Sequence, residues 1–255
     1  MKKIIIIGGS KGIGKAITES LVENHEVICI SRTAPEFQHE NLSHYSCDIL
    51  SQDLPQIEAA DGLIYCPGSI NLKPFNRLSV EDFRTDFEIN VIGAVKTIQA
   101  YTKALLQSES ASIVLFSTVA TQLGMPFHAS VATAKSAVEG LTKSVAADLA
   151  PKIRVNAIAP TITNTELAAK FLRNERMIES TIQRHPLKKY LEPSEVAAMA
   201  TYLLSDISKS ISGQIFNLDC GIVSLKLCTL CDSFFRKKLS QSAPVHGSAR
   251  SAPIL

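Results

Sequence analysis

The feature that most constrains the fold is a glycine-rich turn that directly follows a short run of isoleucines. Residues 4–7 are all isoleucine, and residues 8–14 read Gly-Gly-Ser-Lys-Gly-Ile-Gly. A β-branched run bounded by glycines predicts a strand that is buried on both faces. Apolar residues then recur at helical spacing as far as Leu21. The turn should therefore connect a buried strand to an amphipathic helix.

The alternation of strand-like and helix-like segments continues along the chain. Strand-like apolar runs alternate with segments of helical apolar spacing through the middle and the second half of the chain. This alternation is typical of parallel strands joined by right-handed helical crossovers. We therefore predict an α/β fold, a doubly wound parallel sheet (Rossmann fold) in a single domain. The further strand-like runs are residues 27–30, 63–65, 113–116, 153–158 and 214–218, and the helical segments are 90–106, 134–149 and 193–204.

Charge and composition exclude several classes of protein. The formal net charge is +2, and the segment after Gly221 carries five Lys and Arg residues against one Asp, a charge of +4. The rest of the chain is slightly acidic, which excludes a nucleic-acid-binding surface. The first apolar run ends after four residues, and no later segment approaches a membrane span, so we expect no membrane partner. Scattered cysteines in apolar runs fit free thiols in a reduced, cytoplasmic setting.

The character of the chain changes after about residue 222. Residues 240–255 are rich in Ser, Pro and Ala and show no apolar period. Such a composition does not bury enough surface to order itself. We interpret residues 223–255 as a disordered tail that the fold does not need. Cys228 and Cys231 form a lone CxxC pair, and without a second pair we predict no metal site.

The glycine-rich turn lies where phosphate-binding chemistry requires it. Glycines allow a tight turn and a close approach of the backbone to a pyrophosphate, and the free N–H groups that begin the helix face the anion. Glycine-rich turns also cap ordinary helices, but the position after a buried strand favours a dinucleotide site. The residues that we assign to binding in this turn are Gly8, Ser10, Lys11, Gly12, Ile13 and Gly14.

The end of the second strand favours NADP(H) over NAD(H). A carboxylate there would bind the ribose hydroxyls of NAD and repel a 2′-phosphate, whereas this chain has Ser31 and Arg32. Arg32 and Lys11 can flank that phosphate, which a guanidinium binds bidentately. Two solvated surface cations would give the same pattern. The expected cofactor is NADP(H).

Over residues 1–222, these and further motifs resemble the short-chain dehydrogenase/reductase family. The turn matches the family's TGxxxGxG apart from Ile7, and Asn90 and Lys135 match its catalytic asparagine and lysine. Thr118 falls on the position of the catalytic serine and still supplies a hydroxyl. The resemblance implies that Asn90, Thr118 and Lys135 act in catalysis. It also implies cofactor contacts from Asp48, Gly68, Asn90, Lys135, Pro160, Thr163 and Thr165.

The sequence departs from the family pattern at the catalytic tyrosine. That residue, four positions before the lysine, falls on Val131, and no tyrosine lies between Tyr101 and Tyr190. Valine has no proton to transfer, and an unreplaced proton donor costs about 10²–10⁴-fold in rate. His128, seven positions before Lys135, is the nearest substitute, because imidazole is a competent acid near neutral pH. An ordinary loop histidine would look the same.

Three functions are compatible with these residues. The first is an NADP(H)-dependent reductase of a carbonyl, in a ketone or 3-oxoacyl-like substrate, with an altered proton donor. The second is a reductase of a conjugated C=C bond, and the third is a non-catalytic NADP(H)-binding sensor or assembly protein. By resemblance, residues 163–190 form a substrate lid, whose apolar side hints at an aliphatic or acyl small molecule, although a lid helix packing on its own core would look the same. The resemblance also implies a homo-oligomer, either a tetramer or a dimer.

Overall fold

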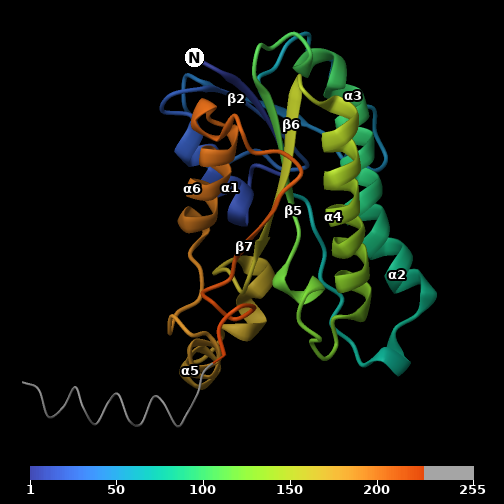
Figure 1. Cartoon of the computed structure of the whole chain (residues 1–255), viewed down its shortest axis with the longest axis vertical. Helices are drawn as coiled ribbons and strands as arrows, with labels where there is room; N and C mark the ends of the chain where they lie inside the picture. Colours follow the sequence, from blue (N-terminus) through green and yellow to red (C-terminus); the bar gives the residue numbers. More distant parts are fainter. Residues whose placement is uncertain (227–255) are drawn as a thin grey trace, which may run out of the picture. The chain divides into compact units, whose positions relative to one another are not determined.

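Seven parallel strands form one sheet in the computed structural model, which describes residues 1–226 (Figure 1). Across the sheet their order is β3-β2-β1-β4-β5-β6-β7, so the strand order reverses between β1 and β4. This topology confirms the predicted doubly wound α/β sheet, in which ligands bind where the order reverses. The strands are β1 Lys3–Ile7, β2 Glu26–Ser31, β3 Leu42–Ser46, β4 Gly62–Tyr65, β5 Ala111–Phe116, β6 Ile153–Pro160 and β7 Ile215–Leu218.

Helices cover both faces of the sheet. The first and last helices, α1 and α6, pack together on one face, and α3 and α4 cover the other (Figure 1). The helices are α1 Gly12–Leu21, α2 Val80–Phe87, α3 Gly93–Leu105, α4 Ala129–Leu149, α5 Glu175–Arg184 and α6 Pro193–Leu204, with a π-helical turn η2 at Glu88–Ile92 and short 3₁₀ segments that include η3 Val119–Thr121 and η4 Glu166–Phe171.

The isoleucine run of β1 supplies both cores. Ile4 and Ile6 point into the core beneath α1 and α6, whereas Ile5 and Ile7 point into the core beneath α3 and α4. None of the four side chains is more than 1% exposed. Burying a side chain of this size contributes about 1.5–3 kcal/mol. A strand that faces two cores therefore needs an apolar residue at every position, as the sequence indicated.

The elements β3 and α2 did not follow from apolar spacing. β3 is an edge strand in which no side chain is fully buried, so it lacks an apolar run. α2 is polar, and its start is determined by a capping box in which Ser79 and Asp82 bond each other's backbone N–H groups. The predicted lid contains η4 and α5. The predicted helix over residues 90–106 also begins differently, as the π-helical turn η2.

Some sequence predictions fall partly or wholly outside the described residues. The tail, predicted over residues 223–255, is described only as far as residue 226, and Cys228 and Cys231 lie beyond that point. Within residues 1–226, no helix is both long and apolar enough to cross a membrane. The same range holds no group of three His, Cys, Asp or Glu residues that could bind a metal ion.

Candidate cofactor and catalytic site

The glycine-rich turn forms a cradle that side chains would fill. Gly8 and Gly12 have φ angles of +74° and +53°, in the left-handed region that favours glycine. A Cβ atom on Gly14 would overlap the carbonyl oxygen of Gly8. The helix that follows has no acidic residue in its first turn and no side-chain cap. Its first N–H groups are therefore free for an anion, as a bound pyrophosphate requires.

The segment after β6 returns to this turn. The methyl group of Thr165 lies 3.4 Å from the position of a Cβ on Gly12. Lys11, expected at the 2′-phosphate, pairs with Glu166 across 3.4 Å in an exposed contact. Thr163 is buried, and its hydroxyl donates to the carbonyl of Thr161. The structure thus places Thr165 beside Gly12 of the glycine-rich turn.

The ends of β2 and β3 carry Ser31, Arg32 and Asp48, three of the residues that the sequence assigned to the cofactor. Ser31 is buried, and its hydroxyl donates to the Thr33 carbonyl at 2.7 Å. Arg32 is exposed, and none of the ion pairs within residues 1–226 involves it. Asp48 accepts from the Leu50 N–H at 3.1 Å and so caps its own turn.

One carboxylate does lie near this end of the site. Glu36 accepts a hydrogen bond from Lys15 at 2.7 Å. That hydrogen bond and the charge of Lys15 hold the pKa of Glu36 below its usual value. Because Lys15 neutralises it, Glu36 opposes a nearby phosphate less than a free carboxylate would.

Lys135 is buried on α4 and points toward the carboxyl ends of β4 and β5. Its Nζ donates to the carbonyl of Phe116 at 2.8 Å. Burial lowers the pKa of Lys135 from 10.5 to about 8, while Cys66 and Asp86 raise it. A buried ammonium with further protons to donate fits the hydroxyls of a ribose.

Asn90 lies in η2, on the opposite side of the same space. Its Nδ2 donates to the backbone carbonyl of Asp86 at 2.7 Å. A polar side chain that bonds a backbone carbonyl in this way is typical of an irregular helical turn such as η2. Its Oδ1 is buried and has no hydrogen-bond partner among the described residues. A Cβ on Gly68 would lie 3.3 Å from that oxygen and 3.5 Å from the Nζ of Lys135. Asn90, Lys135 and Gly68 therefore converge on one small space.

Thr118 follows β5 and begins η3. Its Oγ1 accepts from the Ala120 N–H at 3.3 Å, which leaves its own proton free for another acceptor. The segment around it is held by Glu139 of α4, which accepts hydrogen bonds from Ser117 at 2.5 Å and from Thr121 at 2.8 Å. Since Lys135 of the same helix donates to the Phe116 carbonyl, the segment on both sides of Thr118 is bonded to α4.

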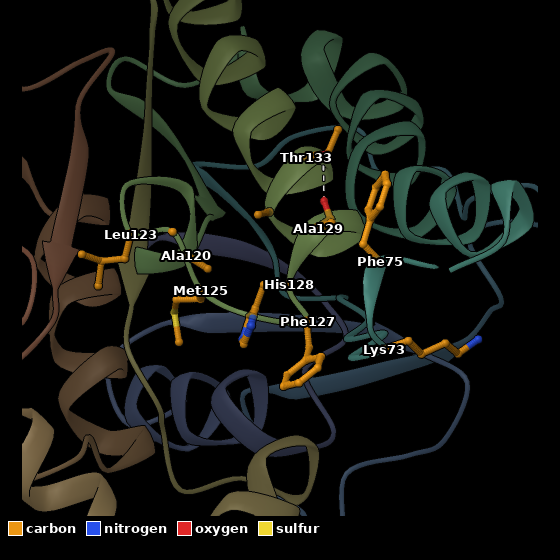
Figure 2. A pocket seen from close by; sticks show the side chains of 11 residues that line it. Lys73, Phe75, Ala120, Leu123, Met125, Phe127, His128, Ala129 and Thr133 are labelled. Atoms are coloured by element: carbon orange, nitrogen blue, oxygen red, sulfur yellow. Dashed lines mark hydrogen bonds between the residues drawn. The ribbon is translucent and has the colours of Figure 1, made fainter. Parts of the chain in front are cut away.

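His128 lies apart from these groups. It precedes α4 and lines a pocket of 440 Å³ with Lys73, Phe75 and the loop over residues 123–129 (Figure 2). Its Nδ1 lies 2.7 Å from the carbonyl of Pro126. The lining of this pocket includes none of Asn90, Thr118 and Lys135. Within residues 1–226, no side-chain hydrogen bond joins His128 to any of these three candidate residues.

The position expected for the tyrosine is filled by a buried side chain. Val131 is 4% exposed and lies one helical turn before Lys135. It carries no polar atom. Ser130, the residue directly before Val131 in α4, carries a hydroxyl and is 1% exposed. Its Oγ donates to the Asn71 carbonyl at 3.5 Å.

The end of the lid is fixed to β6 by a histidine that sequence reasoning missed. Pro160 ends β6, and the hydroxyl of the next residue, Thr161, lies 2.7 Å from the Nε2 of His185. The other ring nitrogen lies 2.7 Å from the Thr181 carbonyl, and the ring is 1% exposed. Because the Thr181 carbonyl can only accept, Nδ1 donates to it, and Nε2 of a neutral ring then accepts from the Thr161 hydroxyl.

A second group missed by sequence reasoning surrounds Asp86. This carboxyl group is fully buried, and its Oδ1 accepts from Ser69 at 2.5 Å and from Asn71 at 3.1 Å. Its Oδ2 has no hydrogen-bond partner in the described chain. The available signal was spacing, since Asp86 lies four residues before Asn90 and so shares its helical face.

Comparison with known proteins identifies the family. A family model described as enoyl-(acyl carrier protein) reductase matches residues 8–223. The chain is 30% identical to 2,5-dichloro-2,5-cyclohexadiene-1,4-diol dehydrogenase of Sphingobium indicum, over 88% of this chain and 98% of that protein. The chain belongs to the short-chain dehydrogenase/reductase family. It is also 32% identical to a tropinone reductase homolog of Datura stramonium, over 85% of this chain and 90% of that protein.

Solved structures of this dehydrogenase/reductase family share the fold. Aldohexose dehydrogenase of Thermoplasma acidophilum superposes with a TM-score of 0.81 at 27% identity, covering 89% of this chain and 96% of that one. ElxO with NADP bound superposes with a TM-score of 0.78 at 26% identity, covering 88% of this chain and all of that one. The relatives are dehydrogenases and reductases, so the chain is an oxidoreductase of this family acting on small molecules.

Proposed function

We propose that this protein is an NADP(H)-dependent reductase of a carbonyl group, in a ketone or a 3-oxoacyl-like substrate, with a proton donor other than tyrosine. The observation that carries the proposal is the convergence of Asn90, Lys135 and Gly68 on one space at the carboxyl edge of the sheet. The glycine cradle lies at the same edge, beside the reversal in strand order. A nicotinamide dinucleotide bound there supplies or accepts the hydride.

The residues of the chain divide the remaining work. Lys135 binds ribose hydroxyls, Thr118 orients the carbonyl oxygen through its free proton, and Asn90 presents Oδ1 toward Lys135. Gly8, Gly12 and Gly14 admit the pyrophosphate. His128 is the candidate proton donor from the loop before α4, and it would have to reach the substrate from the neighbouring pocket.

Preference for NADP(H) is supported by Arg32, which has no ion-pair partner in the described part of the chain, and by the NADP bound to the relative ElxO. We expect Arg32→Ala to weaken NADPH binding by about tenfold, because one charge-assisted hydrogen bond pair to phosphate is lost. NADH binding should stay unchanged. Fluorescence titration of both cofactors measures this, with Arg84→Ala as a matched exposed control on α2. Equal affinity of the unaltered protein for NADPH and NADH would contradict the preference.

A second candidate function is reduction of a conjugated C=C bond. The buried Val131 favours it, because hydride addition at the β carbon leaves an enolate that needs only an oxyanion donor and a slow proton. The matching family model, described as enoyl-(acyl carrier protein) reductase, points the same way.

One experiment separates the candidates. NADPH oxidation is followed with a panel that pairs saturated ketones and 3-oxoacyl thioesters with their unsaturated counterparts. Oxidation of NADPH by the saturated carbonyl compounds supports the proposed function. Oxidation of NADPH by the enones alone supports the second candidate. If NADPH binds but no member of the panel oxidises it, the protein is a non-catalytic NADP(H)-binding protein.

We also propose that copies of this chain associate through α2 and α4. Val80 and Phe87 of α2 are 69% and 40% exposed. They line a groove of 660 Å³ that continues onto α4 at Ala134. Exposed apolar side chains along a groove are typical of an interface. A monomer by light scattering would overturn this assignment.

A further inference from the structure

A buried chain of hydrogen bonds runs from Asn90 to Asp86 inside the candidate site. The Asn90 amide donates to the Ser69 hydroxyl at 3.1 Å, and that hydroxyl donates to Asp86 Oδ1 at 2.5 Å. Asn71 donates to the same carboxylate oxygen. These hydrogen bonds join α2 and η2 to the loop after β4. Asp86 is 0% exposed and Asn90 is 1% exposed.

The direction of this chain is set at its Asp86 end. An ionised carboxylate accepts hydrogen bonds and cannot donate them. The single proton of Ser69 therefore goes to Asp86, and the Ser69 oxygen becomes an acceptor for Asn90. The backbone carbonyl of Asp86 is a second acceptor for the same amide group. With both amide protons used, Asn90 must turn Oδ1 the other way.

Asn90 Oδ1 faces the space beside Gly68, and Lys135 faces it from α4. The two atoms lie 3.3 and 3.5 Å from the position of a Cβ on Gly68. Oδ1 is without a partner in residues 1–226, while Lys135 donates to the Phe116 carbonyl and has further protons. The space thus offers one acceptor and one charged donor. A hydroxyl group satisfies both, because it donates one hydrogen bond and accepts another.

We propose that Asp86 is a positioning residue, which orients Ser69 and Asn90 so that the space beside Gly68 binds one ribose hydroxyl of the nicotinamide dinucleotide. This inference rests on the proposed function for its ligand. Asp86 does not touch the cofactor and acts through the two side chains that it orients. The family resemblance gave no role to Asp86 or Ser69, and the assignment comes from the buried contacts alone.

The charge of Asp86 has a second, measurable effect on Lys135. Burial lowers the pKa of Lys135 to about 8, and Cys66 and Asp86 act against that shift. Burial raises the pKa of the Cys66 thiol, so the thiol is uncharged near pH 8. Glu139, one turn along α4 from Lys135, accepts hydrogen bonds from Ser117 and Thr121. Removing the charge of Asp86 should therefore lower the pKa of Lys135 further.

The test measures NADPH affinity from pH 6 to pH 9 for five variants. Asp86→Asn keeps an acceptor but loses the charge, so the loss of affinity at alkaline pH should begin about half a pH unit lower. Asp86→Leu and Ser69→Ala interrupt the chain of hydrogen bonds and should each weaken NADPH binding about tenfold at pH 7. Ser69→Thr keeps the hydroxyl and should restore affinity. Glu88→Gln, an exposed carboxylate two residues from Asp86, should leave both the affinity and its pH dependence unchanged.

A double variant separates positioning from general damage. Because Asp86 and Ser69 act in one chain, Asp86→Leu with Ser69→Ala should bind no more weakly than Asp86→Leu alone. Additive losses, or an unaltered pH dependence in Asp86→Asn, would overturn the inference. Melting temperatures identify unfolded variants, and Asp86→Asn is the variant that best preserves shape. If the predicted binding pattern appears but no panel substrate is reduced, the reductase proposal fails and the inference stands.

Discussion

Replacing Lys135 with methionine should abolish most NADP(H) binding and at the same time stabilise the folded protein. The lysine supplies a charged donor to the ribose, and its loss should weaken binding by about 10- to 100-fold. Binding by the unaltered protein should also fall as the pH rises through about 8, where the ammonium loses its proton. In Lys135→Met this pH dependence should disappear.

The stability change follows from the same pKa. Folding lowers the pKa of Lys135 from 10.5 to about 8. A shift of this size lowers the free energy of unfolding by about 3 kcal/mol at neutral pH. The penalty is fully present below pH 8 and declines between pH 8 and 10.5, where the unfolded chain holds the proton more tightly. Methionine removes the penalty but leaves the Phe116 carbonyl without this donor, at a cost of about 1 kcal/mol.

Urea unfolding at pH 7 measures the net effect, which should be a gain of about 1–2 kcal/mol. Lys143→Met is the matched control, because Lys143 is exposed on the same helix. It should change neither binding nor stability appreciably. A Lys135→Met protein that binds NADPH as tightly as the unaltered chain would exclude the lysine from the site.

Val131→Tyr should raise the rate of carbonyl reduction by at least about tenfold. A phenol at this position would lie one turn before Lys135, on the side of Thr118, and would restore a proton donor. Tenfold is less than a well-placed general acid supplies, because Val131 is only 4% exposed and a larger side chain must displace its neighbours. Val131→Phe is the matched control, with the same ring and no proton. It should gain nothing.

His128→Ala gives the complementary measurement in the unaltered protein. If His128 is the proton donor, its removal should lower the rate of reduction. The rate should remain unchanged if the imidazole only contacts Pro126 in the neighbouring pocket. A Val131→Tyr variant without gain, together with an unaffected His128→Ala variant and no reduction of any panel substrate, would leave the non-catalytic function as the better account.

Local sequence signals predicted most of the fold because its central strands are buried on both faces. Such strands need apolar residues at every position, and Ile4–Ile7 and residues 113–116 show this directly. The edge strand β3 and the polar helix α2 gave no such signal. β3 is defined by pairing with β2, and α2 by the capping box at Ser79. Pairing with a neighbouring strand therefore determines β3, whereas a local capping signal of polar residues determines the start of α2.

The sequence by itself determined the parallel sheet, the glycine cradle and the absence of a carboxylate at Ser31, because each depends on a residue's own conformational freedom, apolarity or charge. Only the tertiary structure decided which candidate side chains meet. It placed Asn90 and Lys135 around Gly68, left His128 in a different pocket, and buried Asp86 against Ser69 and Asn71. Hydrogen bonds between segments far apart in sequence depend on three-dimensional direction, which the spacing of residues along the chain does not contain.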